Sequence, residues 1–484
     1  MEKKTKAGKV FYIIYIVIFF ATLSVLSLGM LVFHADDSKE KRQTAALPKL
    51  TKTETGANGE KKTKLNLDYF DQLSDYFTDH FAFRQELTTM DAKLKSALLH
   101  SSNQDRVVLG MEGWLFYEAS MHDYLGQDVL SDRGVYAASR VLYLLQENCE
   151  INNRKFLFVC APNKNSLYGR YMPGNYIRTD EPTNFEMLRT RLDEAGVVYE
   201  DLHAAFLSDP RVMYHKQDSH WNNEGATFAV DLILDRLEIA HYDYENEPFK
   251  IEREHRGDLY NILYPASEEL DENVIYDHAH SYRYVREIKD MEDPVIMTSC
   301  AEAEGSLLMF RDSYGNATIP YIADCFGKGF FSWGQPVDID MAQYQNANVV
   351  IYEIVERNIP WLIEYLPYMV APVRDCPQDA EKVQDSQAEL HVEEIGNRYV
   401  IYGTVDQKYT ADDSRLLVRL TADDGTELCV EATPASFKRL DSAKDCEYTY
   451  GAYIDKTAVS GGFTASLITE KNGQAYEQAD ERWN

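Results

Sequence analysis

Two short segments of the sequence combine side chains that can carry out nucleophilic catalysis. The first, YHKQDSHWNNEGA at residues 214–226, places Asp218 two positions before His220 and ahead of a predicted helix. In extended backbone, side chains two positions apart point to the same side, about 7 Å from each other, so the carboxylate can turn back onto Nδ1 of the imidazole. An aspartate that orients a histidine is half of the system that activates a catalytic nucleophile.

A serine in the second segment can be that nucleophile. Ser313 lies in RDSYG at residues 311–315, directly after the apolar run SLLMF. A serine at a strand-to-helix turn is exposed at the carboxyl edge of a sheet, where the first amides of the helix can stabilise an oxyanion. Each motif alone also fits a structural role, an N-cap for Asp-Ser and a hydrogen-bonded turn for Asp-x-His. Together they supply a nucleophile, a base and an orienting acid.

Metal binding is the competing interpretation of these histidines. Imidazole and carboxylate donors are closely spaced in two groups, which are His215, Asp218 and His220, and then Asp277, His278 and His280. His215 and His220 differ by an odd number of positions, so one extended segment would point them to opposite faces. The second group lies in the charged segment YDHAHSYRYVRE, which predicts an exposed loop. We therefore predict neither a metal nor another cofactor, and a metal hydrolase stays open as the alternative.

The elements that must position Ser313 and His220 predict an α/β domain at residues 65–372. From residue 105 to 370, short apolar runs alternate with amphipathic stretches. Continuous apolar runs, which are typical of strands buried on both faces of a parallel sheet, occupy residues 155–160, 306–310 and 349–354. Helical spacing predicts helices at 136–146 and 225–237. We expect a parallel sheet with helices on both faces.

The chain beyond residue 372 predicts a second, all-β domain. Residues 373–387 are polar, contain proline and lack apolar periodicity, so they predict a linker. Residues 388–484 contain short apolar runs separated by turn signals, which is typical of a small β-sandwich. The predicted strands are 399–405, 416–420, 427–433, 448–454 and 463–469. We expect this accessory domain to fold around a core of its own.

The N-terminal region predicts one membrane anchor. Residues 10–33 carry no charge and, as a helix, are long enough to cross a hydrocarbon core of roughly 30 Å. The preceding lysines predict a cytoplasmic tail at 1–9 and an extracellular remainder, whereas a cleaved signal peptide would have a shorter apolar run. Residues 34–64 are polar and predict a flexible linker. Apolar spacing at 65–100 predicts two short helices.

Composition excludes several classes of protein. A chain of 484 residues that is 45% hydrophobic is neither disordered nor a single small module. The formal net charge of −30 repels nucleic acid, so we predict no nucleic-acid partner. Seven scattered cysteines without a CxxC pair predict neither a zinc ribbon nor a disulfide framework. Cys429 and Cys446 are close enough in sequence to form a disulfide in an oxidising compartment, and their pairing is left open.

The order of the motifs along the chain resembles a known family. Four blocks carry the resemblance: FAFRQEL (81–87), GMEGWLFY (110–117), DSHW (218–221) and RDSYG (311–315). In these blocks the chain resembles the SGNH-like O-acetyltransferases of the alginate acetylation type, and more closely the DHHW family. The resemblance implies an SGNH-hydrolase-like domain in which Ser313, His220 and Asp218 form a catalytic triad.

Two departures from the family pattern affect the predicted site. Ser219 stands where the Asp-His-His-Trp block has its first histidine, although we expect this side chain to point away from the triad. The second oxyanion donor, which SGNH enzymes generally take from a glycine and an asparagine on other loops, has no evident match. The candidates for oxyanion or substrate contacts are Asn163, Lys164, Trp221 and Tyr314.

The resemblance also implies a function. We expect a membrane-anchored extracellular enzyme that moves an acetyl group onto, or off, a hydroxyl of an extracellular polysaccharide through an acetyl-Ser313 intermediate. A membrane-bound O-acyltransferase would supply the acetyl group. Transfer and hydrolysis differ only in whether a sugar hydroxyl or water attacks the intermediate, so the sequence leaves that choice open. The second hypothesis is a non-catalytic polysaccharide-binding or assembly factor with the same fold.

Overall fold

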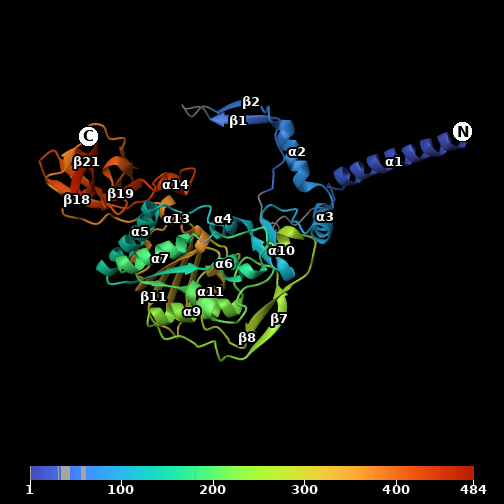
Figure 1. Ribbon diagram of the computed structural model, residues 1–484, viewed down its shortest axis with the longest axis horizontal. Helices are drawn as coiled ribbons and strands as arrows, with labels where there is room; N and C mark the ends of the chain where they lie inside the picture. The colour runs from blue at the N-terminus through green and yellow to red at the C-terminus, as the bar shows by residue number, and fades with distance from the viewer. Residues whose placement is uncertain (1, 31, 34–43, 56–60, 180, 460) are drawn as a thin grey trace. The chain divides into compact units, whose positions relative to one another are not determined.

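The computed structural model describes residues 2–30, 32–33, 44–55, 61–179, 181–459 and 461–484 (Figure 1). The chain divides into two units. The first unit comprises Met1–Glu118, Lys216–Ser219 and Arg253–Glu272. The second unit comprises Ala119–His215, His220–Glu252 and Asn273–Asn484.

Seven strands form the central sheet of the second unit, in the order β6-β5-β13-β11-β12-β10-β9. The strands from β6 to β12 are parallel, and β10 and β9 extend the β12 edge in antiparallel fashion. Their bounds are β5 (Lys155–Ala161), β6 (Tyr199–Glu200), β9 (Arg283–Tyr284), β10 (Val295–Ser299), β11 (Ser306–Arg311), β12 (Lys328–Trp333) and β13 (Val349–Val355). The three strands predicted from apolar runs are β5, β11 and β13, and they lie side by side.

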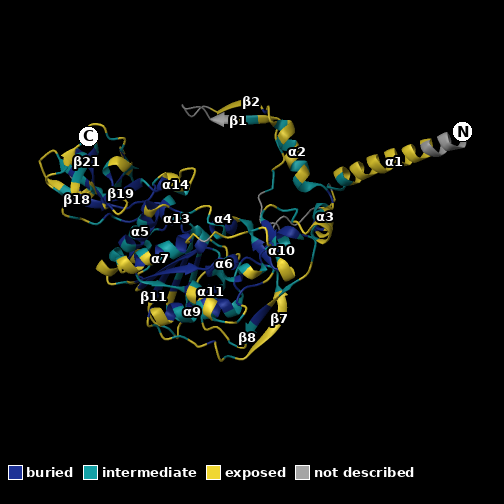
Figure 2. Cartoon of the chain, in the orientation of Figure 1, coloured by how far each residue is buried: buried dark blue, intermediate teal, exposed yellow. Residues whose placement is uncertain are grey.

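Helices cover both faces of this sheet, which confirms the predicted α/β fold (Figures 1 and 2). Phe158 and Leu308 pack into one core with α5 and α7. Leu157 and Leu307 are equally buried and, by the alternation of strand side chains, point to the opposite face, where α8, α9 and α11 lie. The helices of this unit are α4 (Met121–Tyr124), α5 (Asp132–Ile151), α6 (Lys164–Tyr168), α7 (Asn184–Ala195), α8 (Leu202–Ser208), α9 (Asn223–Arg236), α11 (Gly315–Ala323), α12 (Met341–Tyr344), α13 (Trp361–Glu364) and α14 (Ala443–Cys446).

Polar caps explain where the two predicted helices begin. The side chain of Ser131 accepts a hydrogen bond from Gly134 N, and α5 therefore starts before the first residue of the predicted 136–146 helix. Asn222 accepts from Gly225 N in the same way at the start of α9. The second cap fixes the backbone directly after the DSHW segment.

The carboxyl-terminal strands form two sheets of a sandwich, as predicted. One sheet has the order β14-β21-β20-β17-β18 and the other β15-β16-β19. Their bounds are β14 (Glu381–Lys382), β15 (Glu389–Ile395), β16 (Arg398–Thr404), β17 (Leu416–Ala422), β18 (Glu427–Ala432), β19 (Thr449–Asp455), β20 (Phe463–Lys471) and β21 (Gln474–Trp483). The sequence missed β15 and β21, which are rich in charged residues, and β14, which lies in the predicted 373–387 linker.

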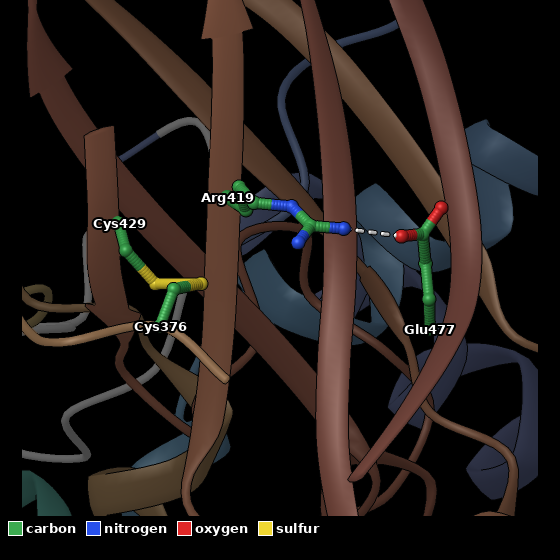
Figure 3. The surroundings of a disulfide bond; sticks show 4 residues. All are labelled: Cys376, Arg419, Cys429 and Glu477. Atoms are coloured by element: carbon green, nitrogen blue, oxygen red, sulfur yellow. Dashed lines mark hydrogen bonds and ion pairs between the residues drawn. A yellow bond between two sulfur atoms is a disulfide. The ribbon is translucent and has the colours of Figure 1, made fainter. Parts of the chain in front are cut away.

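A disulfide in this sandwich joins Cys429 to Cys376 (Figure 3). Pairing of Cys429 with Cys446 is therefore wrong. Val430 faces the sandwich core, so its neighbour Cys429 faces the outer surface of the sheet, where Cys376 lies. Cys446 is instead a free thiol buried in the core that contains α5. In the same sheet, an ion pair of 2.5 Å between Arg419 of β17 and Glu477 of β21 crosses the intervening strand β20.

The sandwich has its own core but also shares one with the α/β sheet. The apolar cluster that contains Leu142 of α5 also contains Val400, Cys446 and Tyr453 of the accessory region. The accessory domain has the expected core of its own, and the cluster that it shares with α5 was not foreseen from the sequence. One sandwich sheet, β15-β16-β19, buries its outer side against the α/β domain rather than exposing it to solvent.

The first unit begins with a long apolar helix, α1, and its other elements are shorter. Within α1, Lys9–Gly29 has a mean hydropathy of 2.4 and is long enough to cross a membrane. The described helix ends at Gly29, four residues before the predicted end of the span. The helices are α1 (Glu2–Gly29), α2 (Tyr69–His80), α3 (Arg84–Leu99) and α10 (Asp258–Leu263), and the strands β3 (Val107–Leu109) and β4 (Leu115–Tyr117) pair. Two further strands, β7 (Phe249–His255) and β8 (Asp271–Tyr276), also pair, and each has residues in both units.

Part of the predicted flexible linker is a hairpin. Strands β1 (Thr51–Thr55) and β2 (Lys61–Leu65) pair in antiparallel register, with Thr53 opposite Thr63. Threonine favours strands, and cross-strand threonine pairs stabilise them, which a prediction based on polarity overlooks. The linker prediction is wrong for these strands, and its residues 34–43 and 56–60 lie outside the described residues.

Candidate active site

Ser313 lies in the turn between β11 and α11, at the carboxyl edge of the parallel sheet. The preceding residue fixes this turn. The carboxylate of Asp312 accepts hydrogen bonds from Tyr314 N at 2.9 Å, Val355 N at 2.8 Å and Asn358 Nδ2 at 2.8 Å. Three donors on one buried carboxylate tie the turn to the end of β13. Asp312 therefore holds the turn in shape while the next side chain, Ser313, is left half-buried.

The first residue of α11 must be glycine because the chain approaches two neighbours closely. A Cβ atom on Gly315 would lie 2.8 Å from Arg311 Cβ and 3.1 Å from Glu353 Oε2. Glu353 is buried beneath the turn, and its Oε2 accepts the N–H of Asp312 at 3.3 Å. Burial, and then the nearby charge of Asp312, raise the pKa of Glu353 well above its ordinary value.

His220 meets Ser313 directly. Nε2 of His220 lies 2.8 Å from Oγ of Ser313. Trp221 donates from Nε1 to the carbonyl oxygen of Tyr314 at 3.1 Å, so the residue after the base is hydrogen-bonded to the residue after the serine. The rings of His220 and Tyr314 lie 4.8 Å apart. The structure thus brings together the predicted base and the predicted nucleophile.

Trp221 and Tyr314 pack against each other at this site. Both side chains are buried, with 2% and 1% of their surface exposed. Their rings pack edge to face, 5.2 Å apart. A contact of Trp221 or Tyr314 with substrate stays a prediction.

The segment that carries His220 is not extended, contrary to the assumption behind the predicted Asp-His geometry. Tyr214 and Trp221 are antiparallel bridge partners, and His215 N donates to the carbonyl of His220 at 3.3 Å. The chain therefore folds back on itself between them. His215 and His220 therefore do not lie on one extended strand, and the prediction that they point to opposite faces of it is wrong.

Asp218 belongs to the first unit, where hydrogen bonds fix the orientation of its carboxylate. His255 Nε2 lies 2.9 Å from Asp218 Oδ2, and the same oxygen accepts from Asp258 N at 2.8 Å. Burial opposes a charged imidazole, but the hydrogen bond to Asp218 and its charge outweigh burial, so the pKa of His255 is raised. Ser219 Oγ donates to Asp258 Oδ2 at 2.7 Å. The sequence offered no signal for His255, which lies 37 residues beyond Asp218.

Asn163 and Lys164 are buried at the end of β5. Asn163 donates from Nδ2 to Asp123 at 2.8 Å and from its backbone N–H to Glu356 at 3.0 Å. Its Oδ1 accepts from Arg357 at 3.4 Å, and the Arg357 guanidinium lies 5.7 Å from the ring of Tyr314. Burial and the charge of Glu356 raise the pKa of Asp123 well above its ordinary value. An oxyanion role for Asn163 and Lys164 stays a prediction.

The observed geometry defines a class of site. A serine hydroxyl hydrogen-bonded to an imidazole, on the turn after a central parallel strand and ahead of a helix, is the arrangement used for acyl transfer. Residues 107–287 match the family described as "SGNH hydrolase-like domain, acetyltransferase AlgX". The match contains His220 and ends before Ser313. It confirms the resemblance inferred from the sequence blocks, and such a domain indicates an acyltransferase or esterase.

Several solved structures are similar to the chain at low identity. A DHHW family protein from Eubacterium siraeum is 16% identical, with a TM-score of 0.40, over 52% of this chain and 94% of that chain. The O-acetyltransferase domain of Pseudomonas putida AlgJ is 16% identical, with a TM-score of 0.35, over 52% and 92%. Pseudomonas aeruginosa AlgX is 12% identical, with a TM-score of 0.34, over 77% and 94%. No curated protein matches the chain.

Proposed function

We propose that this protein is a membrane-anchored serine O-acetyltransferase, or acetylesterase, that acts on hydroxyl groups of an extracellular polysaccharide. The 2.8 Å contact between His220 Nε2 and Ser313 Oγ carries the proposal. A hydroxyl is a weak nucleophile until a base accepts its proton, and imidazole is the side chain best suited to do so near neutral pH. The match to an acetyltransferase family supports acetyl as the transferred group.

The chemistry proceeds in two steps. His220 accepts the proton of Ser313 while Oγ attacks the acetyl carbonyl, and the leaving oxygen of the donor then takes that proton from Nε2. The result is acetyl-Ser313. In the second step an acceptor hydroxyl gives its proton to His220 and attacks the ester. His220 then returns this proton to Oγ, which releases the acetylated acceptor and restores the Ser313 hydroxyl.

Asp218 is the proposed third member of the triad. It stands two residues before His220, and its carboxylate accepts hydrogen bonds from His255 and from the amide of Asp258. A carboxylate fixed in this way can orient an imidazole and stabilise the imidazolium that forms in each step. His255 would act through Asp218, as a positioning residue.

The acceptor decides between transfer and hydrolysis. A sugar hydroxyl in place of water makes the enzyme a transferase, and we infer transfer, with a membrane-bound O-acyltransferase as the source of acetyl. In hydrolysis, the acetylated polysaccharide would acetylate Ser313 and water would then attack the intermediate, with the same residues in the same roles.

An extracellular location is part of the proposal. The apolar helix within Lys9–Gly29 would anchor the chain, with the lysine-bearing N-terminus in the cytoplasm. The disulfide between Cys376 and Cys429 supports this orientation, because such bonds persist in oxidising compartments outside the cytosol.

Turnover of a chromogenic acetyl ester by the full-length protein in detergent tests the proposal. Ser313→Ala should abolish turnover and leave the melting temperature nearly unchanged, because the Ser313 side chain does not cap α11, whose N-cap is Tyr314. Ser208→Ala is the matched control, since Ser208 is an exposed serine on α8. Turnover by Ser313→Ala above a few per cent would contradict the serine mechanism.

The same assay separates the serine enzyme from a metal hydrolase. EDTA should leave the turnover unchanged at room temperature, since none of the proposed groups needs a cation. Loss of turnover with EDTA, restored by zinc, would transfer His215, Asp218 and His220 to a metal site. A folded protein that binds polysaccharide and turns over no acetyl ester would favour the non-catalytic binding factor.

A further inference from the structure

We propose that His278, His280 and Asp324 bind a divalent transition metal ion, zinc in particular. The three side chains offer two imidazole nitrogens and one carboxylate oxygen that all lie within 4.8 Å of one another. The histidines lie between β8 and β9, and Asp324 directly follows the last residue of α11. All three belong to the second unit.

The distances between the donor atoms fit a shared ion. Oδ2 of Asp324 lies 2.7 Å from His280 Nδ1 and 3.9 Å from His278 Nε2. The second distance is too long for a hydrogen bond. Donor atoms on a tetrahedral zinc ion are separated by roughly 3.4 Å, because each lies roughly 2.1 Å from the metal. The observed distances fall on either side of that value, so movements of less than about 1 Å would complete the site.

The carboxylate is held with one oxygen facing the imidazoles. The backbone amides of Ser281 and Tyr282 donate to Asp324 Oδ1 at 2.8 and 2.9 Å. This leaves Oδ2 directed at both histidines. Hydrogen bonds from outside the ligand set that fix a ligand's orientation are typical of metal sites.

Aromatic side chains fix the two imidazole rings. The ring of His278 lies 4.3 Å from that of Tyr242, and the ring of His280 lies 5.5 Å from that of Tyr321. Packing of this kind limits the rotation of the rings, so the nitrogens stay near their observed positions.

An acidic cavity gives a cation access to the cluster. The cavity has a volume of about 580 Å³ and is lined by His278 and Asp324 together with Glu302 and Glu304. The side chains of His278, His280 and Asp324 keep 21%, 32% and 15% of their surface exposed. The carboxylates attract a cation, and the exposure lets it reach the donor atoms.

The ligand set favours zinc and places it away from the catalytic serine. Two imidazoles and one carboxylate suit zinc among the available divalent ions and leave a fourth position for water. Binding would replace the hydrogen bond between His280 and Asp324, and His280 would then carry its proton on Nε2, so that Nδ1 is free to bind the ion. Asp324 and Ser313 flank opposite ends of the nine-residue α11, which is about 13 Å long. The ion would join α11 to the loop before β9 without entering the acyl transfer.

Titration of metal-depleted, full-length protein in detergent with zinc chloride tests the proposal. We expect one zinc ion per chain, with binding weakened by at least roughly a hundredfold in Asp324→Asn and in His278→Gln. His391→Gln is the matched control, because His391 faces a single carboxylate, that of Glu389, at 3.7 Å. His220→Gln should also keep zinc binding, since His220 lies outside the cluster.

Cobalt(II) in place of zinc provides a second, spectroscopic measurement of metal binding. We expect visible absorption bands of a tetrahedral ion in the wild type, lost in His280→Gln, with circular dichroism showing that the variant is folded. A simple ion pair between His280 and Asp324 would give neither zinc binding nor these bands, and that result would overturn the proposal. Binding that survives Asp324→Asn but is lost in His220→Gln would overturn it as well.

Discussion

At the scale of single residues, the proposed base and the proposed nucleophile are aligned by contacts between their neighbours. Trp221 follows His220, and its indole N–H donates to the carbonyl of Tyr314, which follows Ser313. Asp312, which precedes Ser313, is fixed by three donors. The 2.8 Å distance between Nε2 and Oγ is thus held from both sides, as general-base catalysis requires.

Removing the charge of Asp218 tests whether it orients His220. We expect Asp218→Asn to lower kcat on an acetyl ester by roughly 10³-fold to 10⁴-fold, because a neutral amide stabilises neither the required tautomer nor the imidazolium. Asp271→Asn is the matched control, since Asp271 accepts from the neighbouring Gln217 N at 2.8 Å. A kcat for Asp218→Asn within tenfold of the wild type would remove Asp218 from the triad.

At the scale of elements, β13 supports the turn that carries the serine. Its Glu353 accepts the N–H of Asp312, and the end of the strand donates from Val355 to the Asp312 carboxylate. The strand therefore sets the height of the turn above the sheet. This support includes a buried carboxyl group, which makes the stability of the element depend on pH.

We expect Glu353→Gln to gain melting temperature relative to the wild type as pH rises. The pKa of Glu353 is raised above its ordinary value of 4.5. Its contribution to stability is therefore full below that value and is lost as pH rises towards the raised pKa. Glutamine does not ionise, so the difference in melting temperature should grow above about pH 5. Thermal melts at several pH values measure it, with Glu194→Gln on the exposed face of α7 as control. A difference independent of pH would show that the pKa of Glu353 is the same in the folded and the unfolded chain.

The sequence predicted the elements whose pattern is strongly apolar. Strands β5, β11 and β13 are continuous apolar runs, and turn chemistry placed Ser313 after one of them. It missed β1 and β2, whose polar strands depend on cross-strand pairing. It also missed β21, whose buried positions are Glu477 and Gln478 rather than apolar residues. Contacts between residues far apart in sequence could not be predicted, such as His255 with Asp218 or Asp324 with His280.

At the scale of the whole molecule, the α/β domain and the sandwich of the second unit depend on each other. Their shared apolar cluster includes Leu142 from α5 and Tyr453 from β19. A polar contact joins the same two domains: Arg140 of α5 donates to Glu431 of β18 at 2.7 Å. The polar segment at 373–387 suggested a separable module, since sequence polarity does not reveal which sheet face is covered. A chain truncated near Val373 would expose this cluster.

Breaking the ion pair at Glu431 should therefore destabilise the entire second unit. The Glu431 side chain is fully buried and pairs with both Arg140 and Arg374. We expect Glu431→Gln to lower the free energy of unfolding by about 3 kcal/mol, because it leaves partly buried guanidinium groups without their carboxylate. Denaturant unfolding should show one shifted transition, and Glu427→Gln, at an exposed position of β18, should show little change. Two separate transitions in the wild type would show that the domains fold independently.

Detection of an acetyl-Ser313 intermediate is the most direct test of the proposed function. The full-length protein, incubated with an acetyl ester and quenched in acid, is digested and its peptides are analysed by mass spectrometry. We expect one acetyl group on the peptide that contains Ser313, absent from Ser313→Ala and strongly reduced in His220→Ala. Turnover without acetylation of Ser313, or acetylation at another residue that persists in Ser313→Ala, would contradict it.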